Sequence, residues 1–235
     1  MPDPSRLTKL RGEALDRLVY LVGCPRGGTT VIANSFYLSE EVFSFPRMTR
    51  FSTNVWRYRK KLPSTLLRQL FKMPRFYRED QILKSLGASD RACLAKRICE
   101  AFRSRDIGRL FQLYPTIYAL DPDCTKNPAR AVCWSDKSND IYALSDIHRS
   151  LPHAKFIFIA RDPRATIASM QTQMLTASGA SLSGRNAARA MMVSSIYWRN
   201  MMQRCLCFAS SHPDQCRFVG NVPIDVEVEG RRCPP

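Results

Sequence analysis

Two short apolar runs, each ending in a turn that opens a helix, constrain the fold of this chain most strongly. The first run, residues 18–22, ends at Gly23, and the second, residues 155–160, ends at Arg161. Runs of this length are typical of strands that are buried on both faces of a parallel sheet. Helical segments lie between the candidate strands, and we therefore expect an α/β fold in which helices flank a parallel β-sheet.

The length of 235 residues is enough for one domain with a sizeable core. We expect a mobile polar arm over residues 1–16, a single α/β domain over residues 17–220, and a short atypical tail over residues 221–235. Within the domain, residues 47–130 predict a basic helical insertion. In that insertion we expect Ser89 and Asp90 to cap a helix over residues 91–103, and residues 114–130, which contain three prolines, to form a loop.

The charge balance is unusual, since 36 lysines and arginines outnumber 20 aspartates and glutamates and give a net charge of +16. Such a chain attracts polyanions: nucleotides, nucleic acids, sulfated glycans or an acidic membrane surface. Much of the excess lies in residues 47–109, including the Arg-Tyr-Arg-Lys-Lys run of residues 57–61. No RNP, zinc-finger or basic-zipper pattern accompanies it, so we expect an acidic acceptor and no specific nucleic-acid target. A solvated basic face is the simpler interpretation of the same excess.

Nine cysteines, an odd number, show no spacing typical of a disulfide framework. Cys205, Cys207, His212 and Cys216 follow a C-x-C-x4-H-x3-C pattern that differs from a zinc knuckle at two gaps, so we expect thiols and no metal. Unpaired cysteines favour a reducing compartment, and we expect a cytoplasmic protein, or one of the Golgi lumen if an N-terminal anchor is missing from this sequence. The first apolar run is too short to span a membrane, and we expect no transmembrane segment.

The turn after the first run has the composition of a phosphate-binding loop, because residues 23–30 are Gly-Cys-Pro-Arg-Gly-Gly-Thr-Thr. The glycines allow successive backbone N–H groups to point at an anion, and the start of a helix adds partial positive charge. A Walker A loop has a lysine where this chain has Thr29, which argues against an ATPase or GTPase. We expect a P-loop-containing nucleotide-binding type of fold; a glycine-rich turn without a ligand is the alternative.

The turn after the second run carries a second candidate for phosphate binding. Arg161 stands at the end of the strand, and Ser169 lies about two turns into the next helix. A guanidinium and a hydroxyl placed in this way can converge on one phosphate. Asp162 and Pro163 are typical of a helix start, so an ordinary capped helix beside a surface arginine is the alternative.

Both turns resemble the donor-binding elements of PAPS-dependent sulfotransferases, where PAPS is 3′-phosphoadenosine 5′-phosphosulfate. Residues 25–30 resemble the P-R-[SG]-G-T-T loop that holds the 5′-phosphosulfate, and Arg161, Pro163 and Ser169 match the R-x-P-x-x-x-x-x-S element that grips the 3′-phosphate. Residues 151–157 resemble the family's F-P-x-A-K-F-I segment. The resemblance implies that PAPS, as co-substrate, or its product PAP is bound without a metal by Arg26, Gly27, Gly28, Thr29, Thr30, Arg161 and Ser169.

A third resemblance concerns the chemistry of transfer. Residues 134–139 resemble the family's W-x-[DE]-K-[ST]-P segment, which implies that Lys137 lies near the sulfate, together with Arg26. Family members commonly carry a glutamate in a P-E-T-x-F-F setting after the second strand, whereas residues 47–51 here are Arg-Met-Thr-Arg-Phe. Asp136 is the nearest candidate for the missing base, and a structural hydrogen-bond acceptor in a loop is the alternative for that residue.

The resemblance implies a sulfotransferase that moves a sulfuryl group from PAPS to a hydroxyl or amine of a carbohydrate, a peptide or a small metabolite. The family's acidic Y-E-D-L-type segment and nucleotide-covering loop do not follow residue 220, so we expect an end that is truncated relative to the family. The alternatives are a catalytically impaired PAPS- or PAP-binding relative and, third, a P-loop nucleotide kinase or NTPase.

Overall fold

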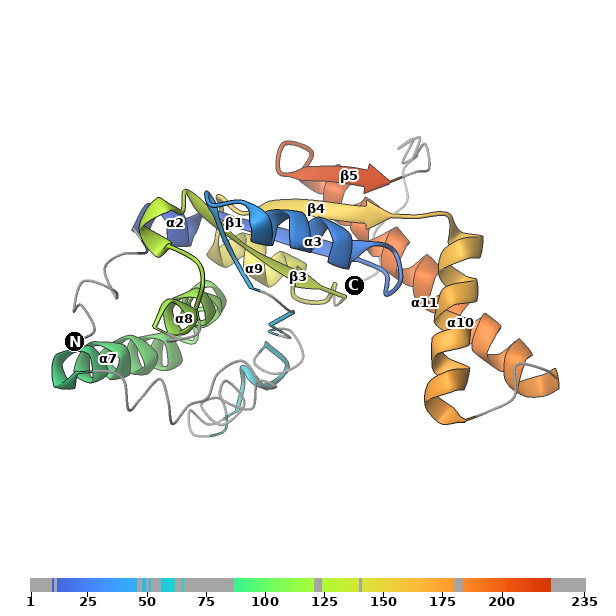
Figure 1. Cartoon of the computed structure of the whole chain (residues 1–235), viewed down its shortest axis with the longest axis horizontal. Coiled ribbons are helices and arrows are strands. Elements are labelled where there is room, and N and C mark those ends of the chain that lie inside the picture. Colours follow the sequence, from blue (N-terminus) through green and yellow to red (C-terminus); the bar gives the residue numbers. More distant parts are fainter. Residues whose placement is uncertain are drawn as a thin grey trace. The chain divides into compact units, whose positions relative to one another are not determined.

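The computed structural model describes residues 10, 12–45, 48–49, 51, 56–61, 65, 87–120, 124–139, 141–179 and 184–220. Strands and helices alternate along this part of the chain (Figure 1). The strands are β1 (Leu18–Gly23), β2 (Val42–Ser44), β3 (Cys133–Ser138), β4 (Lys155–Ala160) and β5 (Cys216–Gly220). The α-helices are α2 (Gly12–Asp16), α3 (Thr29–Leu38), α7 (Ala88–Ser104), α8 (Ile107–Ala119), α9 (Leu144–Ser150), α10 (Pro163–Ser178) and α11 (Gly184–Ser211), and two 3-10 helices are η1 (Trp56–Tyr58) and η2 (Pro128–Arg130).

Five strands form one sheet in the order β2-β3-β1-β4-β5. Val42 lies opposite Cys133 in the parallel pair of β2 and β3, and Phe156 lies opposite Cys216 in the parallel pair of β4 and β5. Strand β1 is buried along almost its whole length, as its continuous apolar run predicts. The predicted α/β fold, a parallel sheet flanked by helices, is confirmed.

The chain divides into two compact units. The first unit comprises residues 1–20 and 33–155, and the second unit comprises residues 21–32 and 156–235. The core of the first unit is an aromatic cluster, in which Phe111 stacks on Phe51 with ring centroids 4.1 Å apart and meets Trp134 edge-on at 4.9 Å. Burial of these large rings removes much apolar surface from water, and their edge-on geometry adds to that stabilisation.

The second unit has a smaller aromatic core between its sheet edge and its longest helix. Phe208 of α11 packs against Phe156 and Phe158 of β4, with ring centroids 4.9 and 6.2 Å apart. Phe158 also contacts Phe218 of β5 at 5.2 Å. Helices α10 and α11 pack against each other.

Two local predictions for the basic insertion were wrong. Helix α7 begins at Ala88 after Gly87, with no side-chain cap, so Ser89 and Asp90 lie inside its first turn. Part of the predicted loop over residues 114–130 is helix α8, which continues through Pro115 to Ala119. Nearly every residue of α8 is buried, and this packing outweighs the helix-breaking tendency of one proline.

The domain boundaries predicted from the sequence fall partly outside the described residues. Of the predicted arm, residues 1–9 and 11 lie outside them, whereas residues 12–16 form α2, in which Ala14 and Leu15 are buried. The backbone carbonyl of Leu15 accepts a 2.8 Å hydrogen bond from Trp134 Nε1, which ties α2 to β3. The predicted tail, residues 221–235, and most of residues 50–86 of the insertion also lie outside the described residues.

Candidate functional site

The loop after β1, where the sequence predicts phosphate binding, makes a tight turn directly before α3. The N–H of Gly27 donates to the carbonyl of Cys24 at 2.9 Å, and α3 begins at Thr29 directly after the turn. Two residues of the loop have positive φ angles, 68° at Arg26 and 99° at Gly28. A positive φ is costly for arginine, so the surrounding turn must hold Arg26 in this conformation.

Gly27 and Gly28 of this loop are required for different reasons: Gly27 has no room for a side chain, and Gly28 has a positive φ angle. A Cβ atom on Gly27 would lie 2.9 Å from the carbonyl oxygen of Cys24, closer than such contacts allow. Gly28 has open space around it but needs its left-handed conformation, which other residues adopt only with strain. Both positions therefore need glycine for the turn that leads into α3.

The second predicted element is built by the turn between β4 and α10. Asp162 caps α10, because its carboxylate accepts a 2.8 Å hydrogen bond from the N–H of Arg164, and Pro163 occupies the first helical position. The Arg164 side chain also pairs with Asp162 and lowers the pKa of that carboxyl. This cap leaves Arg161, just before it, extending from the strand end as an exposed cation.

The structure brings these two elements into direct contact within the second unit. Arg26 Nε donates to the hydroxyl oxygen of Ser169 at 3.0 Å, and Arg161 Nη1 donates to the backbone carbonyl of Arg26 at 3.3 Å. Arg26 is 143 positions from Ser169 and 135 positions from Arg161 in the sequence, yet the three residues form one cluster. Two guanidinium groups, a hydroxyl and the N-terminus of α3 meet there, an arrangement suited to two phosphate or sulfate groups.

One buried contact beside this cluster is between two sulfur atoms. Cys24, in the phosphate loop, is buried with its Sγ 3.4 Å from Met170 Sδ. Burial raises the pKa of the Cys24 thiol to about 12 and raises that of Cys205 further, so both stay protonated at neutral pH. These cysteines therefore support the loop as small apolar residues.

Lys137 and Asp136 are neighbours in β3, in the first unit, and not in a loop as the alternative interpretation of Asp136 had it. Because successive side chains on a strand point to opposite faces, the two side chains leave β3 in opposite directions. Lys137 is partly exposed, and burial lowers the pKa of its amine, an effect that the charge of Asp136 opposes. A lysine at the carboxyl end of a parallel strand is well placed to reach a ligand.

Asp136 is 4% exposed and both of its carboxylate oxygens have partners. The backbone N–H of Thr49 donates to one oxygen at 3.2 Å, and the Thr49 hydroxyl donates to the other at 2.5 Å. The Thr49 hydroxyl oxygen in turn accepts from the N–H of Phe51 at 3.2 Å, so the carboxylate holds the turn that leads to the stacked Phe51 ring. Burial raises the Asp136 pKa to about 7, against the hydrogen bonds from Thr49 that lower it.

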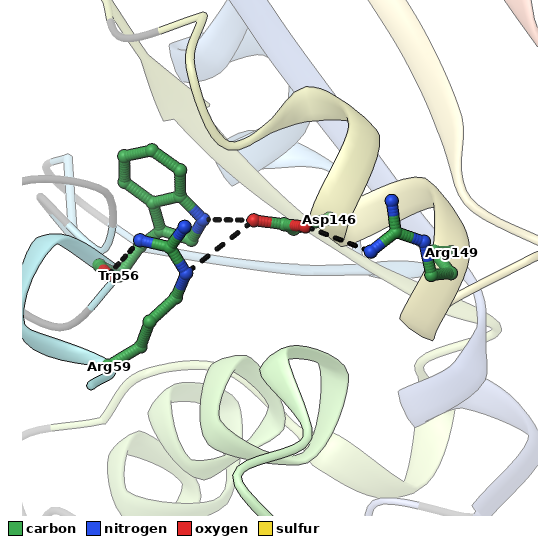
Figure 2. Close-up of polar contacts among 4 residues, drawn as sticks. All are labelled: Trp56, Arg59, Asp146 and Arg149. Carbon is green, nitrogen blue, oxygen red and sulfur yellow. Dashed lines mark hydrogen bonds and ion pairs between the residues drawn. The ribbon is translucent and has the colours of Figure 1, made fainter.

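A second carboxylate in the first unit holds the start of the basic insertion (Figure 2). Asp146, in the first turn of α9, accepts a 2.7 Å hydrogen bond from Trp56 Nε1. Its carboxylate also lies 3.6 Å from Arg59 Nε and accepts from Arg149 Nη1 at 3.2 Å. Figure 2 shows the carboxylate of Asp146 between the Trp56 and Arg59 side chains and that of Arg149.

Three of these contact residues were missed by the sequence analysis. Thr49 lies in the stretch after the proline that was compared with the P-E-T-x-F-F setting, but its match to the threonine there needs one inserted residue, so the motif did not identify it. Trp56 and Asp146 carry no local signal, since they lie 90 positions apart and meet only in the folded chain.

The described residues contain no group of three or more histidine, cysteine or carboxylate side chains that could hold a metal. Of the four residues weighed as a zinc site, Cys205 and Cys216 are buried, and His212 stacks on Phe208 with ring centroids 4.5 Å apart. Among the described residues there is also no helix with the length and apolar character needed to cross a membrane.

Comparison with known proteins gives one clear result. A family model described as the sulfotransferase family matches residues 19–219. This match contains the phosphate loop, β3 with Lys137, and the turn with Arg161 and Ser169. The search of curated proteins gives no match.

Proposed function

Because the chain belongs to the sulfotransferase family, we propose that it moves a sulfuryl group from PAPS to a hydroxyl or amine of a carbohydrate, a peptide or a small metabolite. The single observation that carries the choice of donor is the contact between the two turns. Arg26 binds Ser169 and Arg161 binds the carbonyl of Arg26, so two anion-binding elements form one cluster. A donor with a 5′-phosphosulfate and a 3′-phosphate presents two anionic groups to such a cluster.

The proposed donor site divides its work between the two turns. Gly28, Thr29 and Thr30 would hold the 5′ group through their backbone N–H groups and hydroxyls at the start of α3, and Gly27, whose N–H donates to the Cys24 carbonyl, would shape the turn around it. Arg161 and Ser169 would bind the 3′-phosphate, which distinguishes PAPS from ATP. The loop needs no metal for this, since the donor's charges are met by guanidinium groups and helix N–H groups.

Sulfuryl transfer would proceed as an in-line displacement at sulfur. The acceptor oxygen or nitrogen forms a bond to sulfur, gives up its proton, and the bond from sulfur to the phosphate oxygen breaks, leaving PAP. Negative charge grows on that phosphate oxygen, and we assign Arg26 and Lys137 to stabilise it. Asp136 contributes to catalysis in this scheme by holding the Thr49 turn next to β3, because both of its oxygens are engaged there.

A catalytically impaired PAPS- or PAP-binding relative is the second candidate function. The observation that favours it is the Arg-Met pair at residues 47 and 48, where the family commonly has a glutamate. Replacement of Met48 by glutamate would raise the transfer rate if this is the cause of low activity. A P-loop kinase or NTPase stands third, because Thr29 replaces the lysine that a triphosphate requires.

We base the proposed compartment on the absence of disulfides among the described cysteines. None of the eight cysteines within the described residues forms a disulfide, and four of them, on the first unit, are exposed or partly exposed to solvent. Free accessible thiols persist best in a reducing environment. We therefore propose a cytoplasmic protein, with the Golgi lumen as the alternative.

The transfer reaction itself tests this proposal. Purified protein is incubated with sulfur-labelled PAPS and a panel of saccharide, peptide and phenol acceptors, and labelled product is counted. Replacing Lys137 with alanine should lower the rate constant kcat about a hundredfold, because a cation at the transferring group is lost. Lys96, exposed on α7, gives the matched control, and its alanine variant should stay within about twofold of the original protein.

The outcomes separate the candidates. Transfer that depends on Lys137 and not on Lys96 supports the enzyme. Absence of transfer to every acceptor in the panel, in a protein that binds PAP, would favour the impaired relative. Magnesium-dependent turnover of ATP would move the assignment to the kinase or NTPase class.

A further inference from the structure

The basic segment Trp56–Lys61 is fixed to α9 by one carboxylate, that of Asp146 (Figure 2). Trp56 is bound through its indole N–H, and Arg59 is bound through its guanidinium, which also donates to the carbonyl of Trp56 at 3.1 Å. The Arg59 guanidinium lies 4.1 Å from the centre of the Trp56 ring, so the two side chains pack on each other as well. Asp146 thus orders a segment whose own composition would keep it extended by charge repulsion.

This anchor leaves three cations of the segment facing solvent: Arg57, Lys60 and Lys61, called the basic strip below. None of the three forms an ion pair or hydrogen bond with another residue in the part of the chain that is described. Asp146, the carboxylate that anchors the segment, is already shared by Trp56 and two arginines. Among the described residues, the strip therefore carries charge that no carboxylate neutralises, at a place where the backbone is held.

We propose that the basic strip binds a saccharide chain that carries sulfate or carboxylate groups, and that Asp146 is the residue that positions the strip for it. An ordered row of cations loses less conformational entropy on binding than a floppy one, which is how a single anchoring carboxylate raises affinity for an anion. This surface belongs to the first unit and shares no residue with the nucleotide cluster, so it can be tested whether or not the donor proposal holds.

The contacts of Trp56 favour a saccharide over a single-stranded nucleic acid. Single-strand binding without sequence preference depends on bases that stack on open aromatic rings. In this segment the indole N–H of Trp56 is bound by Asp146, and one face of the ring is covered by Arg59. The exposed side chains described between residues 57 and 61 are the cations of the strip, which suits a ligand held by charge and hydrogen bonds.

The decisive test changes the anchor rather than the cations. A heparin-derived octasaccharide with a fluorescent label is titrated with the full chain, and the dissociation constant is measured by anisotropy at several salt concentrations. Replacing Asp146 with alanine removes a negative charge, so a purely electrostatic surface would bind the octasaccharide more tightly. The proposal predicts the opposite, a weakening of about threefold or more, because the strip is no longer held.

A second variant leaves the charge unchanged and protects the test against misfolding. Trp56→Phe removes the indole N–H that Asp146 accepts but keeps an aromatic ring beneath Arg59. It should weaken octasaccharide binding in the same direction as Asp146→Ala, with thermal unfolding confirming that both variants are folded. Binding that is equal to or tighter than that of the original protein in the two folded variants would overturn the positioning role of Asp146.

The contribution of the strip's own cations is tested by comparing two double variants that each remove two positive charges, one in the strip and one on α11. The double variant Lys60→Ala/Lys61→Ala should raise the dissociation constant about fivefold, as expected for two exposed ion pairs, while Arg185→Ala/Arg189→Ala on α11 should change it less than about twofold. Equal losses from the two double variants would mean binding to net charge alone and would overturn the site. Tighter binding of a single-stranded oligonucleotide or of oligoglutamate than of the octasaccharide would overturn the saccharide assignment.

PAP binding is measured on the same samples by calorimetry, so failure of the strip proposal can be distinguished from failure of the donor-site proposal. Loss of PAP binding with the strip intact would count against the donor site alone. Loss of octasaccharide selectivity with PAP binding intact would count against the strip alone.

Discussion

At the scale of single residues, two neighbours in one strand have different roles because their side chains point to opposite faces of the sheet. Asp136 and Lys137 belong to one short motif, yet β3 directs their side chains to opposite faces. Asp136 is enclosed and accepts two hydrogen bonds from Thr49, while Lys137 stays partly exposed. The buried carboxylate therefore holds the fold of the Thr49 turn, and the lysine is the side chain of the pair that is partly exposed to solvent.

Asp136 should make the stability of the protein depend on pH. Its pKa is raised from 3.8 to about 7 in the folded chain, so the folded state holds a proton more tightly than the unfolded state does. The free energy of unfolding should therefore fall as pH rises from about 4 to about 7 and level off above that range, a loss of the order of 2–4 kcal/mol. Asp136→Asn, which cannot titrate, should remove this part of the dependence.

Urea unfolding at pH 5 and pH 8 measures the effect. The difference in unfolding free energy between the two pH values should be smaller in Asp136→Asn than in the original protein. An identical difference in both proteins would show that Asp136 does not titrate in this range.

At the scale of elements, the features that could be predicted were those determined by residues close together in the sequence. The strands β1 and β4 are continuous apolar runs, and the turns after them contain their glycines, proline and arginines within a few residues. Helix α8 was not predictable past Pro115, because its stability comes from burial against distant parts of the chain. The anchors at Thr49 and Asp146 escaped for the same reason, since each joins residues almost 90 positions apart.

The packing of α8 on the end of α9 should depend on Gly108. A Cβ atom there would lie 2.9 Å from the carbonyl oxygen of Ser150 and 3.0 Å from a side-chain carbon of Leu151, so there is no room for a methyl group. Gly108→Ala should lower the free energy of unfolding by about 1–3 kcal/mol, as overpacking does in other cores. Gly12 in α2 has nothing within 4 Å of such an atom, and Gly12→Ala is the control.

Denaturant unfolding of the two glycine variants gives the answer. Gly12→Ala should be neutral or slightly stabilising, because alanine restricts the unfolded chain. If Gly108→Ala is as stable as the original protein, α8 and α9 do not pack as closely as the structure shows.

At the scale of the whole molecule, charge is the property that most affects behaviour. A net charge of +16 means that cations repel one another over much of the chain, and most ion pairs of the described residues are exposed ones of little energetic weight. Repulsion of this kind opposes compact states and is weakened by salt. The same charge attracts anionic ligands to both proposed surfaces.

The free energy of unfolding should therefore rise when sodium chloride is increased from about 0.05 M to about 0.5 M, because the Debye length shortens to a few ångströms. Sodium sulfate at the same ionic strength should stabilise further, since sulfate can occupy the cluster of Arg26 and Arg161. Urea titrations in the two salts measure both effects. A free energy that falls with added salt would show that ion pairs outweigh repulsion in this protein.

The most direct test of the central claim, a donor site for a nucleotide with phosphates at both the 5′ and 3′ positions, is calorimetric titration with PAP against AMP. We predict micromolar binding of PAP and much weaker binding of AMP, which lacks the 3′-phosphate. Arg161→Ala should weaken PAP binding at least about tenfold through loss of a charged hydrogen bond, whereas Arg164→Ala, whose side chain is 90% exposed and pairs with Asp162, should leave it nearly unchanged. Equal binding of PAP and AMP, or no effect of Arg161→Ala, would contradict the account.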